Sequence, residues 1–272
     1  MSGRSILVLG ATGTTGRRVA ARLRAGGADV RAASRNGDVR FDWSDADTWE
    51  PALAGVERMY LMAPHGTPVD EGFVRLAVEQ GVRRLVLLSS RGIEEMGEQR
   101  LLGAERAVRE SGAAWTILRP DWFNQNFDEG FFRPAVLAGA LALPVGDMRQ
   151  AFVDADDIAA VAAAVLTGDG HEGASYELTG PQALSFTEAL GQISHACGRG
   201  VEFRGGDEDY LTQQRTLGLP DEQTKQEIEA YAALRAHGDS APTDAVRRVT
   251  GDDPKPFADY AAEAAAGAAW RD

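Results

Sequence analysis

The sequence predicts an α/β fold in which a doubly wound parallel sheet is followed by a smaller, mainly helical C-terminal region. Short apolar runs alternate with helical patterns up to Pro120, which is typical of parallel strands joined by crossover helices. The first run, 5–9, leads into three evenly spaced glycines, Gly10, Gly13 and Gly16. Beyond Pro120 aromatic residues cluster and the later segments are helical and acidic.

The elements follow one another with clear boundaries. Val19, Ala20 and Leu23 form one helical face after the glycines, and Gly26 ends that helix. Further strands are predicted at 29–34, 39–42, 58–62, 82–90, 115–118 and 175–178, and further helices at 45–53, 70–80, 99–111, 158–166, 221–236 and 258–269.

These elements divide the chain into two predicted units. Residues 1–125, completed by 152–180, form the sheet domain. Residues 126–151 and 181–272 form a cap that closes over the cleft at the sheet edge. We expect the sheet domain to bind a dinucleotide and the cap to bind the substrate, for the reasons that follow.

The glycines after the first strand predict a phosphate-binding loop. Gly10 permits a tight turn, Gly13 lets the backbone approach a pyrophosphate, and Gly16 lets the helix pack closely on the strand. The helix then offers its N-terminal amides to the phosphates. A purely structural turn is the alternative. The loop residues expected to contact the cofactor are Gly10, Thr12, Gly13, Thr14, Thr15 and Gly16.

The end of the second strand distinguishes NAD from NADP. An acidic residue about 20 positions beyond the glycines would bind the ribose hydroxyls of NAD, whereas this chain has Ser34 and Arg35 there. They suit a 2′-phosphate, so the expected cofactor is NADP(H); Arg35 as a solvated surface charge is the alternative. Asp42 and Trp43, after the third strand, could flank the adenine, although Trp43 could equally be ordinary packing.

Loops at the carboxyl edge of the sheet carry the remaining cofactor candidates. Ala63 and Pro64 follow the fourth strand, Ser89 lies at the end of the fifth and Pro120 at the end of the sixth, and open α/β sheets bind ligands at this edge. His65, in the first of these loops, is the candidate catalytic residue, with an exposed loop histidine as the alternative. The four histidines show no ligand spacing, so no metal site is predicted.

An aromatic segment leaves the sheet edge beside the expected nicotinamide. A substrate pocket and a plain hydrophobic seam are equally compatible with it. The predicted pocket residues are His65, Ser90, Trp122, Phe123, Asn126 and Phe127. Asp154, Asp156 and Asp157 precede the alanine-rich helix at 158–166, and an acidic helix N-terminus explains them better than a metal site or a catalytic acid pair.

Composition limits the partners. A net charge of -13 over 272 residues disfavours nucleic acid and anionic membranes, so a small-molecule substrate is expected. The single cysteine, Cys197, excludes an internal disulfide and fits a reducing cytoplasm. The first apolar run is too short for a membrane span and is explained as a strand, so no signal peptide is predicted. A monomer and a homodimer both remain open.

With these residues placed, nearly the whole chain resembles the NmrA-like group of atypical short-chain dehydrogenase/reductases. The motifs that carry the resemblance are the glycine loop 10–16, Ser34-Arg35, Leu87-Leu-Ser-Ser90, Leu118-Arg-Pro120 with Trp122, Phe123 and Asn126, Phe152-Val-Asp154 with Asp157, and Gly251 with Pro254 and Phe257. Segments 41–43 and 120–126 are most similar to the fungal ergot-alkaloid imine dehydrogenases of the agroclavine and festuclavine type and their bacterial relatives. The resemblance implies an NAD(P)H-dependent oxidoreductase.

The chain departs from the wider superfamily at one helix. Typical members reduce carbonyls with a tyrosine that donates the proton and a lysine four residues later, whereas the matching positions here are Leu101 and Glu105. A ketone needs a proton as its oxyanion forms, whereas an iminium carbon already carries the activating charge. The sequence therefore favours NADPH-dependent reduction of an imine or iminium. A quinone or enone reductase, a non-catalytic NADP sensor and an isomerase that uses bound NADP are the alternatives.

Overall fold

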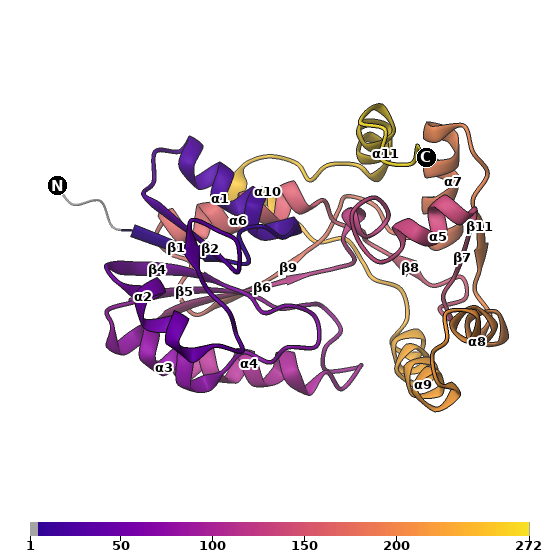
Figure 1. Cartoon of the computed structure of the whole chain (residues 1–272). Helices are drawn as coiled ribbons and strands as arrows, with labels where there is room; N and C mark the ends of the chain where they lie inside the picture. Colours follow the sequence, from indigo (N-terminus) through magenta and orange to yellow (C-terminus); the bar gives the residue numbers. More distant parts are fainter. Residues whose placement is uncertain (1–4, 272) are drawn as a thin grey trace.

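The computed structural model describes residues 5–271, and Figure 1 shows two lobes. One lobe holds a seven-stranded sheet in the order β3-β2-β1-β4-β5-β6-β9, and its neighbouring strands all pair in parallel. This confirms the predicted doubly wound sheet. The strands are β1 (Ser5–Leu9), β2 (Val30–Ser34), β3 (Val39–Arg40), β4 (Val56–Leu61), β5 (Arg84–Leu88), β6 (Ala114–Pro120) and β9 (Ala174–Leu178).

Helices cover both faces of this sheet because its strands are apolar on both sides. Successive residues of a strand point to opposite faces, and in β1 Ile6 and Val8 enter one core cluster while Leu7 and Leu9 enter another. The first cluster is closed by α1 (Thr14–Ala25) and α6 (Ala155–Thr167), and the second by α2 (Trp49–Leu53), α3 (Glu71–Glu79) and α4 (Gln99–Arg109).

The second lobe is mainly helical, as predicted. It also contains two short sheets that the sequence did not predict, because strands of two or three residues give no readable alternation. Its core is aromatic, with Phe127 and Phe152 in contact with each other and each in contact with both Phe186 and Phe257. Its elements are α5 (Arg133–Ala138), β7 (Ala140–Ala142), β8 (Arg149–Gln150), β10 (Leu184–Ser185), α7 (Phe186–Cys197), β11 (Glu202–Arg204), α8 (Asp207–Thr216), α9 (Asp221–His237) and α11 (Phe257–Ala266).

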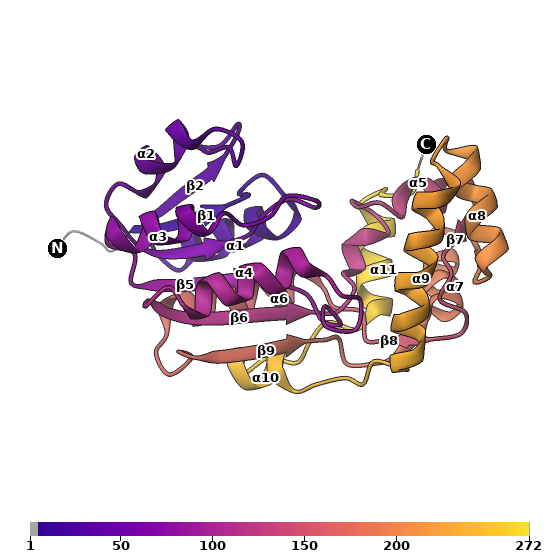
Figure 2. The ribbon, with the colours of Figure 1, turned by 90° about the horizontal axis from the view of Figure 1, so that it is seen from below.

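One segment of the predicted cap does not belong to it. Helix α10 (Ala245–Thr250) packs on α6 and β9, and Ala245 and Val246 are buried in the core of the sheet lobe. The chain therefore returns to the sheet after α9 and then leaves again for α11 (Figure 2). A six-residue helix carries too little periodicity to indicate which lobe it covers.

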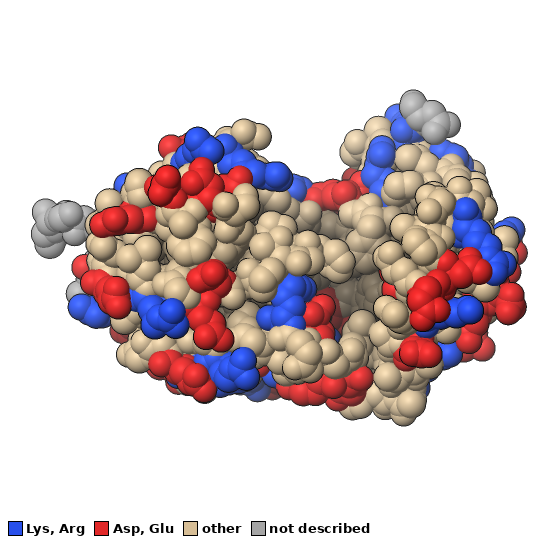
Figure 3. All heavy atoms as spheres, turned by 60° about the horizontal axis from the view of Figure 1, so that its bottom comes forward, with Lys and Arg blue, Asp and Glu red and all other residues tan. Residues whose placement is uncertain are grey.

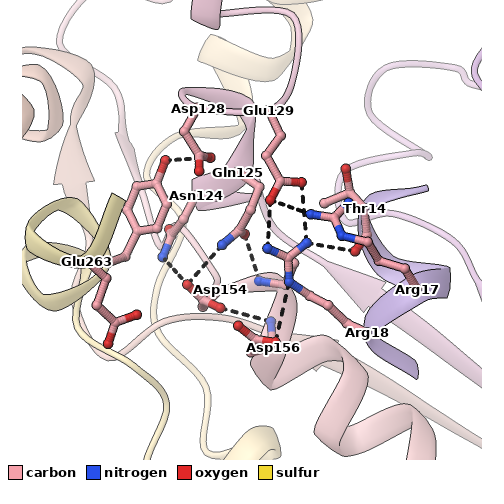
Figure 4. A network of polar contacts seen from close by, with 12 residues as sticks. Thr14, Arg17, Arg18, Asn124, Gln125, Asp128, Glu129, Asp154, Asp156 and Glu263 are labelled. Atoms are coloured by element: carbon pink, nitrogen blue, oxygen red, sulfur yellow. Dashed lines mark hydrogen bonds and ion pairs between the residues drawn. The ribbon is translucent and has the colours of Figure 1, made fainter. Parts of the chain in front are cut away.

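A polar network joins the two lobes where the cap begins (Figure 4). Arg17 and Arg18 of α1 both donate to Glu129, at 2.5 and 2.7 Å. Asp154 caps α6 by accepting from the Asp156 amide at 2.8 Å, which confirms the helix N-terminus interpretation of the aspartates. The same carboxylate accepts from Gln125 at 3.0 Å, so the residue that precedes the cap is fixed directly to the start of a core helix.

None of the helices within residues 5–271 is long and apolar enough to cross a bilayer.

Candidate active site

The glycine loop has the geometry of a phosphate cradle. Gly10 has a φ of +65°, and a Cβ there would lie 2.4 Å from the Met62 sulfur. A Cβ on Gly16 would lie 2.2 Å from the Gly10 carbonyl oxygen, so α1 and β1 approach too closely for any side chain. Gly13 caps α1 without a side chain that could accept from the first-turn amides. These amides therefore remain available to an anion, which fits the pyrophosphate of a dinucleotide.

Gly13 differs from the other two glycines. A Cβ there would meet only the Gly10 carbonyl oxygen, at 3.3 Å, and its φ is an ordinary -85°. The protein itself therefore accommodates a side chain at Gly13 with little movement. Close approach of a ligand remains the physical reason for glycine at this position.

The predicted adenosine end lies at the tips of β2 and β3. Arg35 is exposed, and no described residue forms an ion pair with it. Hydrogen bonds from the Ser44 amide and hydroxyl, with Arg35 and Arg40 nearby, hold the pKa of the Asp42 carboxyl below its usual value. Trp43 packs edge-on against Phe73 at 5.1 Å, in a cluster with Phe41 and Trp49. This agrees with the alternative that Trp43 is an ordinary packing residue. Its contact with adenine stays a prediction.

A cavity of about 640 Å³ opens between the two lobes, where Figure 3 shows the surface hollowed with charged side chains beside the hollow. This is within the usual size range of small-molecule sites. The structure brings five of the six predicted pocket residues to its wall: His65, Ser90, Trp122, Phe123 and Asn126. They come from the loops after β4, β5 and β6, the carboxyl edge of the sheet.

Phe127, the sixth predicted pocket residue, is not part of the cavity. Its side chain is fully buried in the core of the cap, 5.2 Å from the Phe132 ring and 5.6 Å from the Phe257 ring. The short 3-10 turn at Asn124–Asn126 redirects the chain, so the aromatic segment divides. Trp122 and Phe123 face the cavity, whereas Phe127 belongs to the hydrophobic seam.

A family model described as NAD(P)H-binding matches residues 10–169, more than half of the chain. An uncharacterized oxidoreductase of Bacillus subtilis is 36% identical over 275 residues, covering 96% of this chain and 95% of that protein. A (4-alkanoyl-5-oxo-2,5-dihydrofuran-3-yl)methyl phosphate reductase of Streptomyces griseus is 33% identical, covering 95% of this chain and 97% of that protein. The chain belongs to the NAD(P)H-binding family.

Two further comparisons extend this similarity, the first to an enzyme of the festuclavine type that the sequence motifs resemble. Festuclavine synthase II of Penicillium roqueforti is 29% identical, with 94% of this chain and 97% of that protein covered. The structure of an Escherichia coli quinone oxidoreductase complexed with NADPH has a TM-score of 0.75 at 22% identity, covering 95% of this chain and 98% of that one, and this likeness shows the fold. The cofactor of this family is NAD(P)H, and its contact with the glycine cradle stays a prediction.

In this NAD(P)H-binding protein the helix that carries Leu101 and Glu105 serves two purposes. Leu101 lines the cavity with an alkyl side chain. Glu105 is fully buried away from it. It accepts hydrogen bonds from Arg119 Nε at 2.8 Å and from the Ser89 hydroxyl at 2.7 Å, and it forms an ion pair with Arg109 at 2.8 Å. Although burial opposes ionisation, these hydrogen bonds and nearby charges hold the pKa of Glu105 below its usual value.

This cluster changes the expectation for Ser89. Its hydroxyl already donates to Glu105, so a contact with the cofactor would use its backbone or the acceptor lone pairs of the hydroxyl oxygen. The other cofactor candidates at the sheet edge, Ala63, Pro64 and Pro120, keep their predicted places after β4 and at the end of β6. Their contacts with the cofactor remain predictions.

The sequence interpretation missed a second wall of the cavity. The Ser240 hydroxyl donates to Asp121 and accepts from Arg91 at 2.6 Å, and all three residues line the cavity. Tyr231 of α9 lines it too, with its ring stacked 6.4 Å from Trp122. Asp121 follows Pro120 inside a motif already singled out, so it could have been found. Ser240 and Tyr231 lie in segments without any motif.

Burial of this wall shifts the pKa values of its Asp121 carboxyl and Tyr231 hydroxyl groups. Asp121 is only 6% exposed, and this burial raises the pKa of its carboxyl despite hydrogen bonds from Ser240 and the Trp122 amide. Tyr231 is enclosed by the same wall, and burial with the Glu227 charge nearby raises its pKa to about 12. Tyr231 is therefore neutral near pH 7.

Proposed function

We propose that the chain is a reductase that uses NADPH to deliver hydride to a flat, cationic electrophile, namely an imine in its iminium form. That it is an NAD(P)H-dependent oxidoreductase follows from its family and from its relatives, which are named oxidoreductases and reductases. The choice of NADPH rests on Ser34 and Arg35, and the choice of an iminium rests on the cavity wall.

The charge of the cavity wall is the observation that carries the proposal. The described residues that line it include six carboxylates and three guanidinium groups, a formal excess of three negative charges when the histidines are neutral. The carboxylates are Glu94, Glu95, Glu98, Asp121, Glu177 and Asp239, and the guanidiniums are Arg91, Arg100 and Arg119. Such a wall favours a cation and opposes an anionic substrate.

Aromatic faces support the same substrate class. Trp122, Phe123 and Tyr231 line the cavity, and the face of an aromatic ring attracts a cation by about 0.5–2 kcal/mol. A flat iminium can stack on these rings while its charge lies near the carboxylates. A neutral ketone gains only the apolar part of this interaction.

The chemistry requires no proton from the protein. NADPH supplies the hydride when bound. A new C–H bond forms at the iminium carbon, the C=N π pair becomes the nitrogen lone pair, and the product is a neutral amine. Leu101, at the place where a proton donor would stand, offers an alkyl group. The chain's own contribution is to orient the two reactants, stabilise the cation and exclude water.

We assign the binding roles accordingly. The glycine loop holds the pyrophosphate and Arg35 the 2′-phosphate. Segment 120–126 places the nicotinamide against the substrate, since Pro120 ends β6 and Trp122, Phe123 and Asn126 follow at the cavity wall.

A quinone or enone is the second candidate, and His65 on the cavity wall favours it because an imidazole can protonate a developing oxyanion. The Streptomyces griseus relative is named for reduction of an unsaturated lactone, which belongs to this class. If His65 is the acid, His65→Ala lowers kcat for a quinone by about 10-fold or more near pH 7. An unchanged rate assigns His65 to the loop alone.

Steady-state oxidation of NADPH in the presence of N-methyl-3,4-dihydroisoquinolinium tests the proposal. We expect turnover and formation of the tertiary amine. Stoichiometric NADP binding without NADPH oxidation across iminium and quinone panels would instead identify the non-catalytic sensor, and interconversion of isomers without net oxidation would identify the isomerase.

A further inference from the structure

Large apolar side chains are exposed at two places. Within residues 5–271 these side chains are Met96, Phe131, Leu217 and Leu219. Leu217 and Leu219 lie in the turn between α8 and α9, whereas Met96 and Phe131 both line the cavity, with 37% and 65% of their surface exposed. Exposed large apolar groups gathered at one site indicate a binding surface, whereas scattered ones do not.

The two residues bring apolar surface to the cavity from opposite lobes. Phe131 belongs to the cap, where its ring lies 4.3 Å from that of Phe132 and 6.4 Å from that of Trp122. Met96 belongs to the loop between β5 and α4, whose Glu95 pairs with His237 of α9 at 3.3 Å. Apolar surface therefore borders the cavity on both sides.

The cavity combines a buried carboxylate with apolar surface at its mouth. Asp121, the most buried of the carboxylates that line the cavity, is 6% exposed, whereas Phe131 is 65% exposed. Apolar Ile93 and Leu234 line it too, at 2% and 8% exposed, so the buried wall is apolar with a few polar groups, as in most ligand pockets. A ligand that matches this wall has a charged head and an apolar tail, with the head inserted first.

We propose that Phe131 and Met96 form a tail subsite at the mouth of the cavity, which binds an alkyl or aryl substituent of a substrate whose cationic head lies near Asp121. The assignment of the head rests on the proposed function, whereas the tail subsite requires only binding. The substrate class is thereby narrowed to amphiphilic iminium compounds.

Isothermal titration with non-reducible cations tests the subsite separately from turnover. The probes are alkyltrimethylammonium ions from ethyl to octyl, titrated into the full chain saturated with NADP⁺. Burial of one methylene is worth about a four-fold change in affinity, so we expect Kd to fall about two- to four-fold per methylene once the chain reaches the rim. Alkyl sulfates of equal length should bind more weakly, since the wall is acidic.

Two matched variants locate the effect. Phe131→Ser should flatten the dependence of Kd on chain length while leaving the shortest probe unchanged. Leu217→Ser removes an apolar side chain of similar exposure, 68%, that does not line the cavity, and it should keep the dependence intact. Both positions are exposed, so neither substitution is expected to unfold the protein.

Several results would overturn the subsite. One is a Kd that does not depend on alkyl chain length in the unmodified protein, and another is a dependence of Kd on chain length that Phe131→Ser leaves unchanged. A third is that Phe131→Ser abolishes a dimer seen by sedimentation without changing Kd for any probe, which would assign the rim to a second copy of the chain. Failure of the proposed function looks different: the dependence on chain length persists while no iminium compound is reduced.

Discussion

The glycine loop of the sheet lobe and the cavity between the lobes are built in different ways. In the sheet lobe, the predicted phosphate site is a short contiguous loop, and a Cβ at Gly10 or Gly16 would come within 2.4 Å of another atom. Between the lobes, the cavity wall is assembled from side chains of both, which range from His65 to Ser240 along the chain. We therefore expect cofactor binding to depend on local geometry and substrate choice to depend on how the lobes meet.

The largest effect is expected for Gly16→Ala, which tests the close packing of the glycine loop. The added Cβ would lie 2.2 Å from the Gly10 oxygen and 2.6 Å from the Gly10 carbonyl carbon, so backbone has to move. We expect the free energy of unfolding in urea to fall by about 3 kcal/mol or more. Gly103→Ala, in α4 with open space around it, is the control and should raise it by about 0.5–1 kcal/mol. Equal effects would remove the close-packing argument.

Gly13→Val separates binding from folding. Within the protein a Cβ at Gly13 meets only the Gly10 oxygen at 3.3 Å, so stability should change little. A side chain there occupies the space of the pyrophosphate, and we expect binding of NADPH and NADH to weaken about 100-fold or more, ~2.7 kcal/mol. Calorimetric titration measures the affinities for NADPH and for NADH. Retained affinity for either cofactor would show that the pyrophosphate lies elsewhere.

Arg35→Asp tests the choice of cofactor. Loss of a charge-assisted contact to the 2′-phosphate should weaken NADPH by about 2 kcal/mol, roughly 30-fold, and leave NADH almost unchanged. Arg22→Asp, another exposed arginine of the sheet lobe in the last turn of α1, controls for the change in net charge. Equal affinities of the unmodified protein for NADPH and NADH would contradict the assignment.

Asp157→Asn tests the junction between the lobes and has the smallest expected effect. Burial, reinforced by Asp154, raises the pKa of the Asp157 carboxyl to about 6, while its oxygen accepts from the Lys255 amide at 2.8 Å. A raised carboxyl pKa gives stability below the unfolded pKa that is lost as pH rises through about 6. Asparagine keeps the acceptor without the charge, so the variant should be more stable by about 1 kcal/mol at pH 7.5.

The same variant should lose this advantage near pH 4, where the native aspartate is protonated and equally neutral. Urea unfolding at the two pH values measures the difference. A variant that is less stable at pH 7.5 than the unmodified protein would show that the charge of Asp157 is needed by Lys255.

The sequence predicted the elements of the sheet lobe well and the cavity wall only in part. Strand β4 was expected at 58–62 and is observed at Val56–Leu61, because four or more apolar residues in a row show the strand directly. Phe127 was misplaced because composition cannot tell which face of a turning segment each ring occupies. Ser240 contacts Asp121 and Arg91, which lie far from it in the sequence, only in the folded protein. Long-range contacts of this kind leave no pattern in a single sequence.

The departure at Leu101 and Glu105 also has a structural consequence that the sequence alone did not reveal. Glu105→Lys would place a cation against Arg119 and Arg109 in a fully buried position, which is strongly unfavourable. The tyrosine–lysine pair thus cannot be restored here by two substitutions, because the buried carboxylate is part of the core.

The most direct test of the central claim compares two substrates of the same shape that differ in charge. N-methyl-3,4-dihydroisoquinolinium and 1-tetralone are both flat bicyclic electrophiles, and only the ketone requires a proton during reduction. With NADPH in excess, we predict that kcat/KM for the iminium exceeds that for the ketone by about 10³-fold or more, since general acid help is absent and the wall favours a cation. Turnover of the ketone within about 10-fold of the iminium would contradict the account.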